Sequence, residues 1–177
     1  FRIEQYVEMV LGYLRTEDMS ADLKLARCSL DRIIREQIHK YAGIFVAKKL
    51  SLSYEGTDAT VLTDEKWLSF IIEQLLSNAI KYTAKGSVSI YMKPDADRKI
   101  LCIADTGIGI DPADLPRIFD NGYTGLNGRY DMKASGIGLY LCRCIADMLG
   151  ITLTAVSELG KGSVFMLDLT ESKIRHE

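Results

Sequence analysis

Several features that would restrict the function are missing from this sequence. No apolar run approaches the length needed to cross a lipid bilayer, and no signal peptide is visible. The formal net charge of -2 gives no global basic field of the kind that attracts nucleic acid. The four cysteines have the spacing of neither a disulfide framework nor a zinc site (Cys28, Cys102, Cys142 and Cys144). We therefore expect free thiols in a reducing cytosol and no nucleic-acid partner.

What remains is a chain of 177 residues, of which 47% are hydrophobic and 26% charged. This length and composition are typical of one main globular domain with its own core. Because the chain starts at Phe1 rather than methionine, we expect a fragment, with any membrane association in the missing upstream part. An apolar stripe at helical spacing predicts that the chain begins with the end of a bundle helix (Ile3, Val7, Val10, Leu11 and Leu14).

Hydrophobic periodicity and turn residues predict alternating helices and strands after this segment. We expect strands over 25–30, 50–54, 60–63, 87–93, 99–104, 151–156 and 163–169, with 50–54 and 60–63 joined around Glu55-Gly56. We expect helices over 31–49, 64–82, 112–119 and 136–149, the first two capped by Asp31 and Asp64. The inward side of the first helix is predicted to consist of Ile33, Ile34, Ile38, Tyr41, Ala42 and Phe45.

The most informative stretch is Asp-Thr-Gly-Ile-Gly-Ile at 105–110. It follows an apolar run that predicts a buried strand, so an acid stands where a strand ends. Gly107 and Gly109 permit positive φ angles and let a ligand approach the backbone closely. A carboxylate in this position can accept a hydrogen bond from an amino group while the glycine turn packs on a flat ring. Taken alone, the pattern fits an ordinary Asp-x-Gly turn better.

The helix over 64–82 has an apolar stripe opposite a polar side. The stripe consists of Leu68, Ile71, Ile72, Leu75, Leu76 and Ala79, and the polar side of Gln74, Ser77, Asn78 and Lys81. A polar side on a helix is usually just solvated, but asparagine is a poor helix former in an interior position. The amide oxygen of Asn78 is a good ligand for magnesium, and Lys81 offers a point charge to phosphate. On these residues alone, both interpretations stay open.

A glycine-led helix start at Gly136-Ile-Gly138 is predicted to bind an anion. Free backbone N–H groups and the helix dipole both favour phosphate at such an end. The stretch 120–135 just before it has several glycines and little apolar content. We therefore expect a long loop there, and long loops in compact domains tend to be functional.

Taken together and in this order, these stretches resemble the ATP-binding domain of sensor histidine kinases, within the superfamily that includes DNA gyrase, MutL and heat-shock chaperones. Residues 73–82 resemble the N box, 105–110 the G1 box, Ile118-Phe119 the F box and 136–139 the G2 box. Ser163 resembles the last hydroxyl position of the adenine pocket. A narrower likeness, carried by 67–70, 122–129 and 138–142, is to the bacitracin-sensing, intramembrane-sensing kinases of Gram-positive bacteria.

The resemblance implies an α/β (α+β) two-layer sandwich of the Bergerat type, with a mixed sheet covered on one face by helices. It covers the domain 21–170, between a bundle end with linker at 1–20 and a tail at 171–177. It also implies phosphoryl transfer from magnesium-ATP. The resemblance implies that Asp105 recognises adenine and that Gly107, Gly109 and Ile110 pack against the base. It also implies that Tyr82 lies along the flank of the nucleotide. Asn78 is expected to hold magnesium, Lys81 the phosphates, and Gly136, Gly138 and Leu139 to present N–H groups to them.

Two residues depart from the family pattern. Gln74 stands where many histidine kinases have an asparagine, which puts its role at the metal in doubt. Thr124 stands where many have an arginine, so Arg129 becomes the candidate to stabilise the transferring γ-phosphoryl group, although it could equally be a solvated loop residue.

The phosphoacceptor motif, a histidine followed by an acid on a bundle helix, is absent, and neither His39 nor His176 fits it. The resemblance places that acceptor in a bundle domain of the same protein. Its other implied partners are a response regulator and a second copy of the full-length protein, of which this chain would be a cytoplasmic domain. The alternatives are another ATPase of the superfamily, an anti-sigma serine kinase, or a docking module that has lost catalysis.

Overall fold

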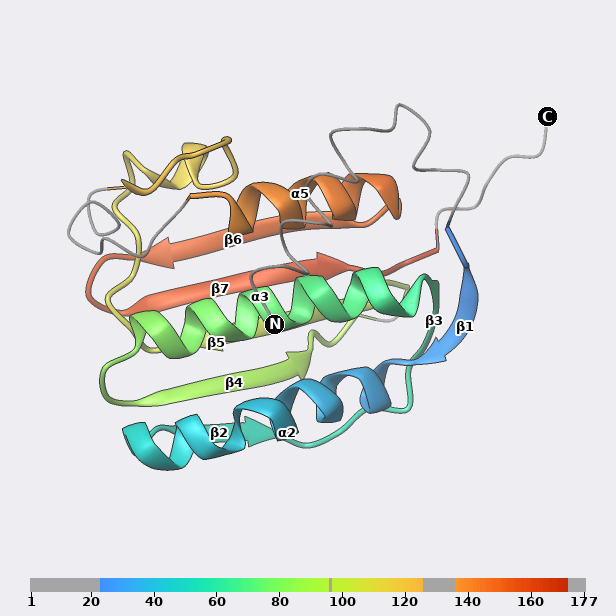
Figure 1. Ribbon diagram of the computed structural model, residues 1–177, viewed down its shortest axis with the longest axis horizontal. Helices are drawn as coiled ribbons and strands as arrows, with labels where there is room; N and C mark the ends of the chain where they lie inside the picture. Colours follow the sequence, from blue (N-terminus) through green and yellow to red (C-terminus); the bar gives the residue numbers. More distant parts are fainter. Residues whose placement is uncertain (1–22, 96, 126–135, 172–177) are drawn as a thin grey trace.

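The structure, a computed structural model, describes residues 23–95, 97–125 and 136–171. Five strands form a mixed sheet in the order β2-β4-β5-β7-β6, in which β2 and β4 are parallel and the other neighbours antiparallel. Helices α2, α3 and α5 lie across one face of this sheet (Figure 1). The predicted two-layer α/β fold is therefore confirmed. The bounds are β1 Ala26–Ser29, α2 Leu30–Lys48, β2 Ser51–Tyr54, β3 Thr60–Thr63, α3 Glu65–Tyr82, β4 Ser87–Met92, β5 Ile100–Asp105, the 3₁₀ helix η2 Leu115–Arg117, α5 Gly138–Met148, β6 Thr152–Glu158 and β7 Gly162–Asp168.

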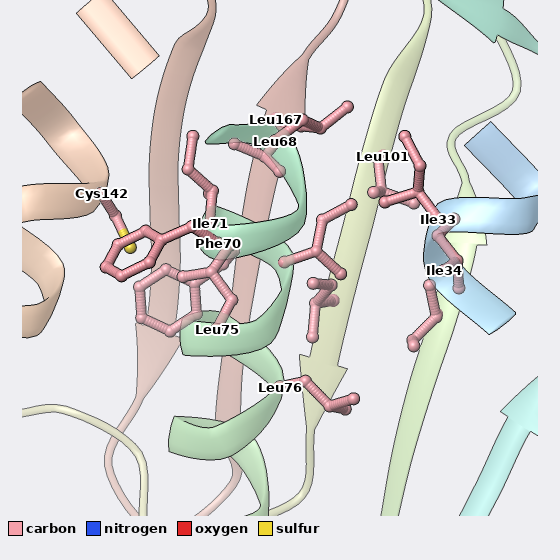
Figure 2. Close-up of a cluster of buried hydrophobic side chains, with 14 of the residues drawn as sticks. Ile33, Ile34, Leu68, Phe70, Ile71, Leu75, Leu76, Leu101, Cys142 and Leu167 are labelled. Carbon is pink, nitrogen blue, oxygen red and sulfur yellow. The ribbon is translucent and has the colours of Figure 1, made fainter. Parts of the chain in front are cut away.

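The core lies between the sheet and the helices, and α3 occupies its centre. All six residues of the predicted α3 stripe are buried. Figure 2 shows α3 side chains such as Ile71 and Leu75 between Cys142 of α5 and Leu101 of β5, in the same cluster as Leu167 of β7. Asp64 caps this helix as predicted, because its Oδ1 accepts hydrogen bonds from the N–H groups of Lys66 and Trp67. Core packing and capping together fix both the direction and the start of α3.

Two predictions about α2 are wrong. Its N-cap is Ser29 rather than Asp31, since the Ser29 hydroxyl accepts from the N–H of Arg32. The Asp31 carboxylate instead accepts hydrogen bonds from Tyr54 and Thr57 and so attaches the segment after β2 to the helix. Ala42 is exposed, and Gln37 is buried in its place. Gln37 continues the face of Ile33 and Ile34 one turn on, so helical geometry overrides its polarity.

The two strands around Glu55-Gly56 form as predicted but lie in different sheets. Strand β2 pairs in parallel with β4, whereas β3 pairs with β1 in a small antiparallel sheet. The hydrogen bond from Leu30 N to Ala59 O, together with the Asp31 contacts, holds the connection between β2 and β3 against α2. The helix expected over 112–119 is reduced to η2, which contains Pro116 and therefore lacks one backbone donor.

Several expectations lie outside the described residues. They are the bundle-helix stripe at 1–14, the centre of the loop at 120–135 with Arg129, and the tail from residue 172. Within the described ranges, no helix is both long enough and apolar enough to cross a membrane.

Candidate functional site

The carboxylate of Asp105 lies at the end of β5, between the edges of β4 and β7. In the sheet register it is opposite Val88 on one side and Ser163 on the other. The side chain is half-buried, and its Oδ1 accepts a hydrogen bond of 2.8 Å from the N–H of Gly107. Burial raises the pKa of this carboxyl group above its ordinary value, while hydrogen bonds from the backbone of Gly107 and Ser163 lower it by less. An acceptor held in this way is suited to a donor on a ligand.

The turn after Asp105 is packed too tightly for side chains at its glycines. A Cβ atom at Gly107 would lie 2.8 Å from Asp105 Oδ1 and 2.9 Å from Thr83 Oγ1, and would also clash with the carbonyl oxygen of Tyr82. Gly109 has a φ of +69°, and a Cβ there would clash with the backbone of Glu158. Glycine is therefore required at both positions, and the turn is held between the end of α3 and the β6–β7 hairpin.

A chain of hydroxyl groups supports the other side of this turn. The hydroxyl of Ser157 lies 2.8 Å from Ile110 N, 2.8 Å from Gly162 O and 2.9 Å from the hydroxyl of Ser163. Since a serine has one proton to donate, Ser157 donates it to Gly162 O and Ser163 donates to Ser157. The hydroxyl of Ser163 is then an acceptor toward any further group. Ser157 was not predicted as a site residue, and its one signal in the sequence is a polar residue at an inward position of β6.

The polar side of α3 contacts the glycine-led start of α5. A Cβ at Gly138 would lie 2.6 Å from Gln74 Nε2, so the absence of a side chain lets Gln74 approach the helix end. The same Gln74 amide donates to Asn78 Oδ1 at 3.4 Å. Both residues are half-buried, whereas Lys81 is exposed, with its Nζ 5.0 Å from the ring centroid of Tyr82. The structure thus brings Gln74, Asn78 and Gly138 together, and Leu139 packs against the core behind them.

These residues fit a magnesium ion that arrives with phosphates rather than a protein-built metal centre. Among the described residues, no group of three or more His, Cys, Asp or Glu side chains could hold a metal ion. The amides of Gln74 and Asn78 offer neutral, hard oxygen atoms beside a helix N-terminus. Magnesium commonly takes one or two protein oxygens together with substrate phosphates and water.

The segment just before α5 lies close to Gly122 and Tyr123. Gly136 has a φ of +67°, and a Cβ there would lie 2.5 Å from the carbonyl carbon of Gly122 and 2.8 Å from Tyr123 O. The hydroxyl of Tyr123 donates to Asp114 Oδ1 at 2.5 Å, and the guanidinium of Arg117 stacks over its ring at 4.4 Å. These contacts fix the segment that begins at Gly136 relative to Gly122 and Tyr123. Arg129 itself lies outside the described residues.

An aromatic contact connects the predicted F box to α5. The guanidinium of Arg143 lies 4.8 Å above the ring centroid of Phe119 and donates to Leu153 O at 2.7 Å. Phe119 in turn meets Phe165 edge to face, with 6.5 Å between centroids. Such cation–π and aromatic contacts add to the apolar packing. No local pattern in the sequence marks Arg143, since only the tertiary fold brings it to Phe119.

Comparison with known proteins identifies the class to which this fold and site belong. Residues 63–173 match the family model described as histidine kinase-, DNA gyrase B- and HSP90-like ATPase. The chain therefore belongs to this family of ATPases, as its motifs predicted.

The similar curated proteins are sensor kinases. The chain is 34% identical over 166 residues to the sensor protein BceS of Halalkalibacterium halodurans, covering 94% of this chain and 50% of that protein. It is 35% identical over 166 residues to BceS of Bacillus subtilis, with the same coverage. It is 35% identical over 167 residues to the sensor protein kinase GraS of Staphylococcus aureus (strain JH1), covering 94% of this chain and 48% of that protein. The chain thus spans about half the length of these relatives.

Solved structures of histidine kinases share the fold. Full-length ShkA in complex with AMPPNP superposes with a TM-score of 0.76 at 23% identity, covering 97% of this chain and 37% of that one. The catalytic domain of histidine kinase ThkA, in a nucleotide-free form, gives a TM-score of 0.72 at 20% identity, covering 83% and 95%. The sheet and helices described above therefore have the same fold as these histidine kinase structures.

The close approach at Gly109 leads to a prediction about stability. Gly109→Ala should lower the free energy of unfolding by about 3 kcal/mol, since it adds a backbone clash to the cost of a left-handed residue. Gly160→Ala is the matched control, because its φ is also positive, at +80°, but nothing lies within 4 Å of the added Cβ. The free energy of unfolding of Gly160→Ala should fall by only about 1–2 kcal/mol. Urea denaturation of both variants measures the difference, and equal losses would show that the Glu158 contact is not tight.

The raised pKa of Asp105 gives a pH-dependent prediction. A carboxyl group whose pKa is raised by folding destabilises the protein once it ionises, so stability falls as pH rises above the ordinary Asp value toward the folded one. Asp105→Asn removes this ionisation but keeps the shape. The stability of the variant relative to the wild type, without nucleotide, should therefore increase between about pH 3 and pH 7. Denaturation at several pH values tests this, and a constant difference would contradict it.

Proposed function

We propose that this domain binds magnesium-ATP and donates the γ-phosphoryl group to a histidine in a bundle domain of the same protein. The phosphoryl group would then pass to an aspartate of a response regulator, and the full-length protein would act as a homodimer at a membrane. The observation that carries the proposal is the position of two features along α3. The Asp105 turn contacts α3 at Tyr82 and Thr83, and the start of α5 contacts it at Gln74. Eight residues of helix separate these points by about 12 Å, which gives the base and the phosphates separate places.

The proposed adenine position is supported by the charge of the Asp105 carboxylate and by the shape of the glycine turn beside it. Asp105 would accept the adenine amino group, while Gly107, Gly109 and Ile110 would pack on the ring, with Tyr82 along the flank of the nucleotide. The Ser157–Ser163 pair holds Ile110 N in place, so Ser163 would contribute to the pocket mainly as an acceptor. A carboxylate that already accepts one backbone N–H and is held in the sheet needs little rearrangement to bind the base.

The proposed phosphate position is supported by the groups that meet at the start of α5, which are backbone N–H groups and the side-chain amides of Gln74 and Asn78. The N–H groups at Gly136, Gly138 and Leu139 would face the phosphates, and Lys81 would add a positive charge. Asn78, with Gln74 beside it, would hold magnesium, which supplies charge neutralisation on the phosphates when bound. Transfer of a phosphoryl group requires mostly positioning and electrostatic stabilisation, and the chain's part is to hold the γ-phosphoryl group toward an incoming imidazole.

Asp105→Asn tests the base end of the proposal. The variant should bind ATP about 5- to 10-fold more weakly, because a charge-assisted hydrogen bond worth about 1.5–3 kcal/mol becomes a neutral one worth about 0.5–1.5 kcal/mol. Asp97→Asn, an exposed position in the β4–β5 connection, is the matched control and should bind as the wild type does. Calorimetric titration with magnesium-ATP gives both affinities. Unchanged affinity in Asp105→Asn would remove this residue from the site.

Arg129 is proposed, from the sequence alone, to stabilise the transferring γ-phosphoryl group. In the full-length protein, Arg129→Ala should slow phosphorylation of the acceptor histidine about tenfold or more while ATP affinity changes little, since the contact is made in the transition state. Lys133→Ala, the other cation of this loop, is the control. The rate of phosphoryl transfer and the affinity for ATP are measured for both variants. A wild-type transfer rate in Arg129→Ala would show that Arg129 is an ordinary surface residue.

A further inference from the structure

Lys48, the last residue of α2, donates hydrogen bonds to the C-terminal end of α3. Its Nζ contacts the carbonyl oxygen of Ile80 and that of Thr83, the latter at 3.0 Å. Carbonyl groups at the end of a helix have no partner within the helix, and the helix dipole favours a positive charge at this end. The half-buried side chain of Lys48 therefore closes the end of α3, although it belongs to another helix.

The end of α3 that Lys48 closes is also the part of the helix that contacts the Asp105 turn. Tyr82 O accepts a hydrogen bond of 3.2 Å from Ile108 N, which lies in that turn. Tyr82 O and Thr83 Oγ1 both lie within 3 Å of the position that a Cβ of Gly107 would occupy. The carbonyl groups that bind the lysine and the one that binds the turn therefore come from the four residues 80–83, so that a shift of one displaces the others.

The chain after α3 makes a second set of contacts with the same turn. Ser87 N donates to the hydroxyl of Thr106 at 2.9 Å, and Thr106 N donates to Ser87 O at 3.1 Å. Just before it, Gly86 O accepts from Ser51 N at 3.0 Å, at the start of β2. The Asp105 turn is thus anchored to the segment 80–87, which is held at one end by the last residue of α2 and at the other by β2.

A second lysine of α2 also contacts α3, but in a different way. Lys40 Nζ lies 3.3 Å from Glu73 Oε2, and the lysine side chain is 46% exposed. An exposed ion pair between two side chains contributes little to stability and does not fix the backbone. Because Lys48 bonds to main-chain carbonyl groups, its loss instead releases the backbone at the end of α3. The two lysines therefore form a matched pair for an experiment.

We propose that Lys48 is a positioning residue for the nucleotide base, which holds residues 80–83 and through them keeps the Asp105 turn in the shape that accepts adenine. The inference deepens the proposed function and rests on it. Lys48 acts through Tyr82 O and Ile108 N rather than by touching the base. A turn that is fixed before binding needs no ordering when the base arrives, so Lys48 raises the affinity for ATP. Since the base is held equally in the bound state and the transition state, the effect falls on KM and not on kcat.

Three variants of the full-length protein separate positioning from general stability. Lys48→Met removes the charge and the donors but keeps an unbranched side chain, Lys48→Arg keeps charge and donors, and Lys40→Met is the matched control. For each variant, KM for ATP and kcat are measured for phosphorylation of the acceptor histidine. Hydrogen exchange without nucleotide is followed by mass spectrometry in the turn 105–110, where Ile108 N donates to α3, and at the start of α5, where Leu141 N donates to Ile137 O.

Lys48→Met should raise KM for ATP roughly 3- to 10-fold at an unchanged kcat, about the effect of one net hydrogen bond. Exchange should become faster in the turn 105–110 and stay at the wild-type rate at the start of α5. Lys48→Arg should restore most of both properties, because arginine also bonds to the carbonyl groups at a helix end. Lys40→Met should behave as the wild type does. If Lys48→Met does not fold, Lys48→Gln, which keeps a donor without the charge, is measured in its place with the same expected direction.

A wild-type KM in Lys48→Met would overturn the inference, as would a KM in Lys48→Arg as high as in Lys48→Met. Exchange that becomes faster to the same extent in both segments would also overturn it, since a loss of overall stability produces that result. If the wild type does not phosphorylate the acceptor histidine with ATP, the proposed function fails as well. If Asp105→Asn raises KM and Lys48→Met does not, only the Lys48 inference fails.

Discussion

Burial of one side of α3 against the sheet is the constraint on which the candidate site depends. The helix packs on β5 and between α2 and α5, and its whole apolar stripe is removed from water. Because side chains three and four residues apart share a side of a helix, burying this stripe turns Gln74, Asn78 and Lys81 another way. The polar side of α3 meets the start of α5 near the middle of α3, at Gln74. The C-terminal end of α3 meets the Asp105 turn. One side of α3 therefore forms part of the core, and the other side carries residues of the candidate site.

The groups around Asp105 lower stability and are concentrated in one place. The carboxylate has a raised pKa because it is half-buried, and the hydroxyl of Thr83 is buried without a partner among the described residues. Each of these features is unfavourable for a protein that only has to fold. Perturbed ionisable groups and unsatisfied polar atoms tend to collect at functional sites, which agrees with a nucleotide pocket here.

The sequence predicted the elements whose signals are local. The α3 stripe with its Asp64 cap, and the strands β4, β5, β6 and β7, follow from periodicity and turn residues that lie close together in the chain. The turn at Asp105–Gly107 was recognisable for the same reason. Two errors arose where tertiary contacts decide. Asp31 bonds across to Tyr54 instead of capping α2, and β2 pairs with β4 rather than with its neighbour in sequence.

The missed parts of the candidate site are likewise contacts between distant segments. Ser157 reaches Ile110 from another strand, Arg143 meets Phe119 from α5, and Gln74 meets Gly138 across more than sixty residues of chain. No local pattern marks such residues, because each is unremarkable until the fold supplies its partner. Thr83 belongs to the same group, since its missing partner becomes visible only when its burial is known.

The most direct measurement of the central claim is a crystal structure of this domain with magnesium and a non-hydrolysable ATP analogue. The adenine amino group is expected to lie about 3 Å from the carboxylate of Asp105. The phosphates are expected to lie at the N-terminal end of α5, beside Asn78. A base bound elsewhere, or phosphates directed away from α5, would contradict the account.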